Sequence, residues 1–285
     1  MSGLGIITFI SDTGWGGGYA AVCEAIVARL NPDARVFHIS HEVPAGDIAA
    51  GALTLGRIAP LYPPGVHVAI VDPGVGTGRR PLALCTPRGD MLVGPDNGVL
   101  IPAAEALGGV TAAWALDPPR VRARAGLPAG AISSTFHGRD VFAPTATLLA
   151  ALTDPASIAT PLDPSTLVRL PEPFAETTPN GATAEVIEVD RFGNIGLALQ
   201  YEALTPLASE YLIEVVGEEE PEWNARVVRT YGDLRPGELG VFRDSWGQVA
   251  VALNSASAAQ LLSVDKGMRV RLTTIPSPPK TDPLT

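Results

Sequence analysis

The chain has 285 residues, of which 46% are hydrophobic and 18% are charged, and its formal net charge is −10. This length and apolar content suffice for one large domain or two modest ones with a sizeable core. The acidic balance argues against nucleic acid and against an anionic membrane surface as partners, because both bind basic faces.

The cysteines and the N-terminal segment indicate the cellular compartment of the protein. The two cysteines, Cys23 and Cys85, lie far apart, which excludes a disulfide framework and a cysteine-based zinc cluster. Both stand among apolar residues, so we expect small buried thiols in a reducing compartment. The N-terminal MSGLGIITFI has no basic region before its apolar run, and no run approaches the ~18 residues of a membrane helix. We therefore expect a soluble, cytoplasmic protein.

The first half of the chain alternates strand-like and helix-like patterns. Strands are expected at 5–10, 34–40 and 66–71, two more within 82–94 around a turn at 87–89, and helices at 19–30, 47–62 and 140–152. Asp47 is a candidate N-cap of its helix. This order predicts an α/β N-terminal domain over residues 1–152, with a mostly parallel sheet.

The second half has a different composition. Residues 153–180 contain six prolines, which indicates a linker or an extended surface segment. Short β-rich runs separated by Gly, Asp and Asn then follow, and they predict a smaller all-β domain over 181–275, an antiparallel barrel or sandwich. Residues 276–285 are expected to form a frayed tail.

Two acids follow strands of the expected parallel sheet. Asp12 and Asp72 each come directly after an apolar run, and ligands of such sheets bind at the carboxyl ends of the strands. The segment SDTGWGGGY after the first strand does not match the dinucleotide-binding pattern GxGxxG. Its acid, Asp12, would repel a phosphate and is better suited to accepting hydrogen bonds from a sugar diol. Spacing alone leaves open a glycine-rich turn that Asp12 merely caps.

The segment VDPGVGTGRR joins Asp72 to two arginines through three glycines. Its glycines allow close approach of the backbone to a ligand, and either Arg79 or Arg80 could turn back toward Asp72. A purely structural Asp–Arg pair is the alternative. Further along, STFHGRD places His137 on a loop before a helix. The other histidines are interpreted as structural, because they lie in or beside strand-like segments: His38, His41 and His67.

Five motifs occur in one order along the chain: FISDTG, VDPGVGTGRR, GPDNGVL, TFHGRDVFAP and DRFGN. Together they resemble the S-adenosyl-L-methionine (SAM) hydroxide adenosyltransferases, relatives of the fluorinase and chlorinase enzymes, over about residues 5–275. The resemblance implies hydroxide attack on the ribose 5′ carbon of SAM, with adenosine and methionine as products. It also implies homotrimers that hold the substrate between the N-terminal domain of one subunit and the C-terminal domain of the next. The implied chemistry needs neither metal nor cofactor.

The resemblance also assigns roles to individual residues. Asp72, Arg79 and His137 match the family's water-activating set, and positioned acid–base groups are worth ~10² to 10⁴ in rate. The expected substrate-binding residues are Asp12 for the ribose hydroxyls, Asp190 and Asn194 for the amino-acid end, and Tyr231, Asn254 and Ser255 for the adenine.

The chain departs from the family pattern in three places. WGGGY stands after the first strand where a second acid is often found. Gly46 stands where an aromatic residue is usual, with Trp15 as a candidate substitute, and IGLALQ follows FGN where a Thr-Asn pair is common. These changes imply an altered grip on the substrate.

Three other functions stay open beside hydrolysis. A halogenase is disfavoured because CTPRGDML leaves no room for the halogenases' extra loop and because an ionised Asp72 would repel a halide. A non-catalytic adenosine or SAM binder would have no use for a water-activating set. A generic nucleotide-binding protein would bind phosphate, which the acids at Asp12 and Asp72 oppose.

Overall fold

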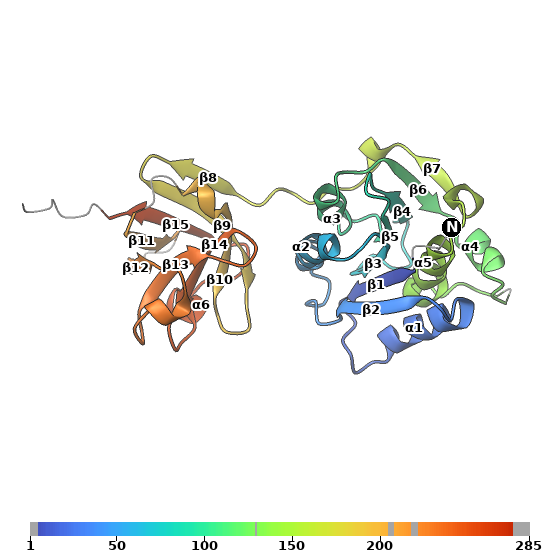
Figure 1. Ribbon diagram of the computed structural model, residues 1–285, viewed down its shortest axis with the longest axis horizontal. Coiled ribbons are helices and arrows are strands. Elements are labelled where there is room, and N and C mark those ends of the chain that lie inside the picture. Colours follow the sequence, from blue (N-terminus) through green and yellow to red (C-terminus); the bar gives the residue numbers. More distant parts are fainter. Residues whose placement is uncertain (1–4, 129, 205–207, 218–221, 276–285) are drawn as a thin grey trace, which may run out of the picture. The chain divides into compact units, whose positions relative to one another are not determined.

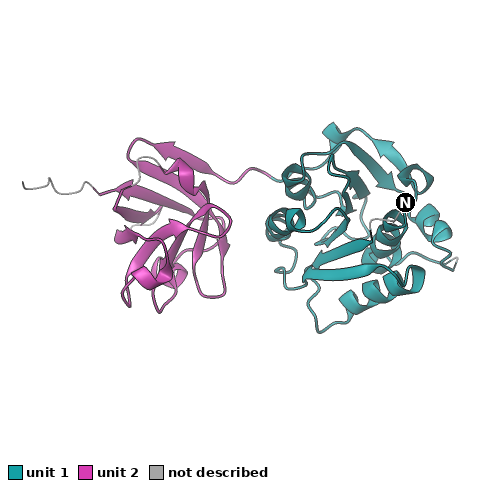
Figure 2. Ribbon diagram, viewed as in Figure 1, with its two compact units in different colours: residues 1–170 teal, residues 171–285 magenta. Residues whose placement is uncertain are grey.

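The computed structural model describes residues 5–128, 130–204, 208–217 and 222–275 (Figure 1). The chain divides into two compact units, Met1–Leu170 and Pro171–Thr285 (Figure 2). Each unit has its own core and is described by itself. Within the described ranges, no helix has the length and apolar content that crossing a membrane requires.

Unit 1 is built on a mixed sheet of seven described strands in the order β2-β1-β3-β5-β4-β6-β7. Their bounds are β1 Ile6–Ser11, β2 Arg35–Ser40, β3 Val66–Ile70, β4 Pro81–Cys85, β5 Met91–Pro95, β6 Ala112–Leu116 and β7 Ala159–Leu162. Strands β2, β1, β3 and β5 pair in parallel, whereas the pairs β5–β4, β4–β6 and β6–β7 are antiparallel.

The predicted α/β class is confirmed, but the parallel part covers only half of the sheet. The reason is the tight turn between β4 and β5, closed by a hydrogen bond from Gly89 N to Thr86 O of 2.9 Å. A short turn joins neighbouring strands only in antiparallel sense, since a parallel connection needs a crossover of a dozen residues or more.

Helices cover both faces of this sheet (Figure 1). On one face lie α1 (Tyr19–Leu30), α4 (Pro118–Arg124) and α5 (Ala143–Ala150), and on the other α2 (Ile48–Ile58) and α3 (Ile101–Ala106). The strands supply both cores because successive side chains alternate: Phe9 joins the first core and Ile10 the second. The predicted helix 19–30 is confirmed, and the carboxylate of Asp47 caps α2 by accepting from Ala50 N at 2.9 Å.

The proline-rich segment 153–180, predicted as a linker, carries a strand of each sheet. Strand β7 is the last strand of the unit 1 sheet, and β8 (Ala175–Thr178) is the last strand of the unit 2 sheet. Edge strands tolerate proline because one side of the backbone has no partner strand. The boundary between the two units falls after Leu170, within this segment.

Unit 2 is a small β-barrel. Its strands run in the order β10-β14-β13-β12-β11-β15-β9, and pairing of β9 with β10 closes the circle, with β8 attached to β9. The bounds are β9 Gly181–Val189, β10 Ile195–Gln200, β11 Glu210–Val215, β12 Trp223–Val227, β13 Leu239–Arg243, β14 Gln248–Leu253 and β15 Arg269–Thr274, with the one-turn helix α6 at Ala258–Leu261. All neighbours are antiparallel except β12 and β13. The predicted tail, 276–285, lies outside the described residues.

A buried polar cluster ties three strands of unit 1 together. The Asp90 carboxylate accepts hydrogen bonds from His67 Nε2 at 3.1 Å, from Arg88 Nε at 2.6 Å and from Gly65 N at 3.1 Å. His67 Nδ1 lies 2.9 Å from Thr8 Oγ1, and both side chains are fully buried. Burial alone would raise the pKa of Asp90, but the hydrogen bonds from His67, Arg88 and Gly65 outweigh it and hold that pKa below its usual range.

We expect Asp90→Ala to lower the free energy of unfolding by about 3–5 kcal/mol at neutral pH, because it leaves the donors of His67, Arg88 and Gly65 without their acceptor. Since the pKa of Asp90 is lower in the folded protein, the stabilisation is present above the unfolded pKa of ~3.9 and is lost as pH falls below it. Urea denaturation at several pH values measures both effects. Glu105→Gln is the control: it removes an exposed pair with Arg169, worth about 0–1 kcal/mol.

Candidate active site

Two loops of unit 1 begin at neighbouring strand ends. Strands β1 and β3 pair in parallel with Ser11 opposite Ile70, so Asp12 and Asp72 follow at the same edge of the sheet. This placement agrees with the sequence-based prediction. It brings two carboxylates to the edge where α/β sheets bind their ligands.

The loop after β3 folds Arg79 back onto Asp72. Arg79 Nε donates to Asp72 Oδ1 at 2.9 Å, Nη2 donates to Asp72 Oδ2, and Nη2 also lies 2.8 Å from Nδ1 of His137. The side chains of Arg79 and Asp72 are only 9% and 5% exposed. The guanidinium also lies 5.4 Å from the ring centroid of Phe142. Three residues that the sequence singled out are therefore one hydrogen-bonded cluster.

Gly76 lets the loop of Asp72 meet the loop of His137. It has φ +79°, and a Cβ there would lie 2.3 Å from the carbonyl oxygen of Ser134. Backbone cannot yield at that distance, so no other residue fits without moving one of the two loops. Gly76 of DPGVGTG thus serves contact between the loops.

Asp140 fixes the loop that carries His137. Its carboxylate accepts from Ser133 N at 2.8 Å, from Arg139 Nε at 2.9 Å and from Arg122 Nη1 at 3.0 Å, and its side chain is buried. His137 itself caps a π-helical turn, Gly138–Phe142, that leads into α5. Such turns are frequent at functional sites. Asp140 belongs to the TFHGRDVFAP motif, but the sequence pattern alone assigns it no role.

The geometry fixes the tautomer of His137. A guanidinium only donates hydrogen bonds, so Nδ1 of His137 must accept from Arg79 and the neutral ring carries its proton on Nε2. Burial and then the charge of Arg79 lower the pKa of His137, and Asp72 and Asp140 oppose this in part. At neutral pH the imidazole therefore presents an N–H donor. Nη1 of Arg79 is a second donor: it is buried and has no hydrogen-bond partner among the described residues.

Arg80, the other candidate partner of Asp72, belongs to a different pair. Its Nε donates to Asp96 Oδ2 at 2.7 Å, and its Nη2 donates to the carbonyl oxygen of Thr166 at 2.6 Å. Asn97 of the same PDNG motif donates from Nδ2 to Val71 O at 2.9 Å. The PDNG turn therefore holds the start of the Asp72 loop in place through Asn97.

Asp12 lies at the start of the glycine-rich loop after β1. Its Oδ2 accepts from the backbone N–H of Gly46 at 2.8 Å, and Gly46 has φ +73°. Trp15, the candidate substitute for an aromatic residue at position 46, is 55% exposed and packs edge-on against His41 with ring centroids 4.6 Å apart.

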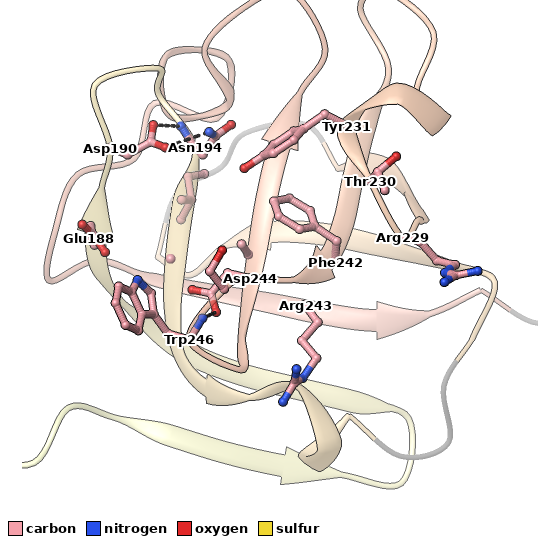
Figure 3. A pocket seen from close by; sticks show the side chains of 14 residues that line it. Glu188, Asp190, Asn194, Arg229, Thr230, Tyr231, Phe242, Arg243, Asp244 and Trp246 are labelled. Carbon is pink, nitrogen blue, oxygen red and sulfur yellow. Dashed lines mark hydrogen bonds between the residues drawn. The ribbon is translucent and has the colours of Figure 1, made fainter. Parts of the chain in front are cut away.

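Unit 2 carries a separate pocket of about 400 Å³ (Figure 3). Asp190, Asn194 and Tyr231 line it, and Asn194 Nδ2 donates to Asp190 Oδ2 at 2.8 Å. The Tyr231 ring stands edge-on to Phe242 at 4.9 Å. Burial, and then the charges of Asp190 and Asp244, raise the pKa of Tyr231, so its hydroxyl keeps its proton.

The pocket also has walls that the sequence did not predict, and the expected adenine-binding residues Asn254 and Ser255 lie outside its lining. Phe242, Asp244 and Trp246 line it; an aromatic residue in the turn DSWG was the available signal. Asn254 donates from Nδ2 to Leu234 O at 2.6 Å, and Ser255 has φ +68°. These two residues hold a strained turn after β14.

Among the residues that the structure describes, no three His, Cys, Asp or Glu side chains are grouped to hold a metal ion. The donors of the unit 1 cluster are instead a guanidinium and an imidazole N–H, which suit a small anion or a water oxygen.

Two family models match this chain: the SAM hydroxide adenosyltransferase N-terminal domain over residues 7–159 and the C-terminal domain over 184–271. The chain belongs to the SAM hydroxide adenosyltransferase family. It is 48% identical over 267 residues to the (R)-S-adenosyl-L-methionine hydrolase of Salinispora tropica, covering 94% of this chain and 97% of that protein. The enzyme of the same name from Salinispora arenicola is 46% identical over 268 residues, with the same coverage.

A solved structure has a similar fold over most of the chain. The crystal structure of an uncharacterized conserved protein from Thermotoga maritima superposes with a TM-score of 0.83 at 30% identity, covering 93% of this chain and 99% of that one. The clustered motifs of unit 1 and the pocket of unit 2 both lie within the ranges matched by the family models.

We expect the pKa of His137 to lie below the ordinary histidine value and to rise in Arg79→Gln. The variant removes the positive charge that lowers the pKa and frees Asp72, which raises it. Histidine NMR titration measures the pKa, and ¹⁵N shifts report the tautomer. Arg80→Gln is the matched control, since Arg80 pairs with Asp96. An unchanged pKa in Arg79→Gln would contradict the contact.

Proposed function

We propose that this chain hydrolyses (R)-S-adenosyl-L-methionine to adenosine and L-methionine by hydroxide attack at the ribose 5′ carbon. The observation that carries the proposal is the cluster of Asp72, Arg79 and His137, which presents two donors at one sheet edge: the buried Nη1 of Arg79 and Nε2 of the half-buried His137. The names of the two Salinispora relatives support the substrate and its configuration at sulfur.

In the proposed mechanism, the cluster stabilises hydroxide. His137 donates from Nε2 and Arg79 from Nη1 to the oxygen of the attacking water, and both donors favour the anion over the neutral molecule. Asp72 accepts two hydrogen bonds from Arg79, which fixes the guanidinium and offsets its charge. Fixed dipoles and charges act more strongly here than in water, because these side chains are largely buried.

The substrate supplies a good leaving group. Displacement at the 5′ carbon turns the sulfonium into a neutral thioether, so no general acid is needed for its departure. In the proposal, Asp12 accepts hydrogen bonds from the ribose hydroxyls and holds the 5′ carbon in line with the hydroxide. Alignment of this kind lowers the activation free energy by several kcal/mol, up to ~7–11 kcal/mol at best.

The unit 2 pocket is proposed to bind the rest of the substrate. Asp190 would pair with the ammonium group of the amino-acid end and Asn194 would bind the same end, while Tyr231 would pack against the adenine. Asn254 and Ser255 are proposed to read the adenine edge through their backbone. The acidic wall, with Asp190 and Asp244, supports binding of a cation.

We further propose that the protein is a cytoplasmic homotrimer whose site forms between subunits. The proposed binding groups are divided between the two units: Asp12 and the catalytic cluster belong to unit 1, and Asp190 belongs to unit 2. A site shared between neighbouring subunits would join them. The free thiols of Cys23 and Cys85 suit a reducing compartment.

The purified protein should convert (R)-SAM to equal amounts of adenosine and methionine, and it should act more slowly on the (S) epimer. In ¹⁸O-labelled water, one labelled oxygen should enter the adenosine 5′-hydroxyl, because water supplies the nucleophile. Chromatography with mass spectrometry measures both, with and without chloride. Formation of a 5′-chloro product, or no product at all, would reject hydrolysis.

Mixing two inactive variants should restore activity if the site is shared between subunits. We expect His137→Ala and Asp190→Ala each to lower kcat/KM by ~10² to 10⁴, the first mainly through kcat. After the two are unfolded and refolded together, mixed trimers would contain some sites with both wild-type residues. Recovery of activity above the sum of the separate variants supports the shared site, whereas no recovery together with sedimentation as a monomer contradicts it.

A further inference from the structure

A chain of five hydrogen-bonded side chains runs from the surface to the glycine-rich loop of unit 1. Glu24 Oε2 lies 3.4 Å from His38 Nε2, and His38 Nδ1 lies 2.7 Å from His41 Nε2. His41 Nδ1 then lies 2.7 Å from Ser11 Oγ, which lies 2.8 Å from Thr13 Oγ1. The carboxylate end is exposed, whereas His41 and Ser11 are buried.

The outer end of this chain fixes the direction of every hydrogen bond in it. A carboxylate only accepts, so a neutral His38 donates to Glu24 from Nε2 and must accept at Nδ1. His41 therefore donates to His38 from Nε2 and accepts at Nδ1, so the hydroxyl of Ser11 donates to His41. Ser11 Oγ in turn accepts from Thr13, whose backbone N–H also points to it at 3.4 Å.

A chain with this polarity passes a proton outward. A proton that arrives at Thr13 can be relayed as each group gives its own hydrogen to the next, and it leaves at Glu24. Burial, and then the charge of His38, lower the pKa of His41 to about 4, so at neutral pH this ring is free of a trapped proton. Trp15 covers both imidazoles, with ring centroids 4.6 and 5.4 Å away.

Hydrolysis of SAM produces a proton that has to leave the site. The sulfonium substrate and one water give adenosine, zwitterionic methionine and one H⁺, as the C–S bond breaks and the C–O bond forms. None of the three catalytic groups is placed to carry that proton away: Nδ1 of His137 accepts from Arg79, and both Asp72 oxygens accept from Arg79. The site therefore needs an outlet.

The inner end of the chain lies at the proposed site. Thr13 follows Asp12, and Ser11 is paired with Ile70, two residues before Asp72. A void of about 10 Å³ is lined by Ser11, Thr13 and His41 together with Ile70 and Phe136, the residue before His137. This volume is close to the smallest that holds one water molecule. Asp72, Arg79 and His137 do not line this void themselves; the relay meets the segments that carry two of them, through Ile70, two residues before Asp72, and Phe136 before His137.

We propose that Thr13, Ser11, His41, His38 and Glu24 form the proton exit route of the hydrolase, an inference that rests on the proposed function. His38 and His41, interpreted from the sequence as structural, thus act on the proton released from water. The groups of this relay pass protons only; they touch neither the 5′ carbon nor the sulfur.

The test breaks the relay at its accessible end. Glu24→Gln replaces the acceptor with an amide that can donate back to His38, and His38→Gln keeps a hydrogen-bonding side chain but cannot pass a proton. We expect each to lower kcat about tenfold in dilute buffer, less than the ~10²-fold loss of a catalytic acid or base, with KM unchanged. Added imidazole should restore the rate, since a small buffer can replace the missing carrier. Glu105→Gln, an exposed glutamate paired with Arg169, is the matched control.

Adenosine is measured by chromatography and proton release by an indicator dye in the same single-turnover reaction. In the variants the proton should lag behind adenosine, and in the wild type and Glu105→Gln it should not. A loss of rate that imidazole leaves unchanged assigns the chain a structural role and overturns the relay. Wild-type rates in both variants, with no lag, also overturn it. A wild-type protein that forms no adenosine instead rejects the proposed function itself.

Discussion

The unit 1 cluster depends on the hydrogen bonds that the guanidinium of Arg79 makes to both Asp72 and His137. One guanidinium joins a carboxylate from the end of β3 to an imidazole 58 residues further along the chain. Because it is permanently charged and only donates, it pairs with both oxygens of Asp72 inside a largely buried cluster and sets the tautomer of His137. Lysine could balance the charge but could not reach both partners with separate N–H groups of fixed geometry.

The same reasoning, applied to an acceptor-only group in place of a donor-only group, explains the direction of the hydrogen bonds in the relay. Arg79 is a group that can only donate, and it forces the ring beside it to accept; Glu24 can only accept, and it forces the ring beside it to donate. Arg79, which can only donate, determines which nitrogen of His137 carries the proton, and Glu24, which can only accept, determines this for His38. In the proposed reaction, an obligate donor therefore orients the imidazole that holds the nucleophile, and an obligate acceptor orients the relay by which the proton leaves.

The sequence predicted the features that are set by local chemistry, and it missed those set by tertiary pairing. The helix at 19–30 and the cap at Asp47 follow from periodicity and capping, and both are confirmed. The choice between Arg79 and Arg80 was open because it depends on Asp96, which competes for Arg80 from another strand end. Strand β7, which contains Pro161, was missed because proline is a poor strand former everywhere except at a sheet edge, and edges are not visible in a sequence. Strand β8 contains no proline, but it lies between Pro173 and Pro179 in the same proline-rich segment. His38 lies in β2 and His41 directly follows that strand, and nothing in their spacing of three residues indicates that their rings meet.

The charge distribution fits a substrate that loses its charge as it reacts. An unpaired carboxylate beside the sulfonium would bind the ground state more tightly than the transition state, in which that charge is disappearing, and would slow the reaction. In unit 1, Asp72 does not have this effect, because the two hydrogen bonds from Arg79 offset its charge. Asp12, which accepts from Gly46 N, is proposed to bind the uncharged ribose hydroxyls. The acids of unit 2, Asp190 and Asp244, line a pocket whose proposed occupant is the ammonium end, and that end keeps its charge throughout. An acidic protein can thus attract a cation at one end and still leave the reacting sulfur without an anionic partner that would resist its neutralisation.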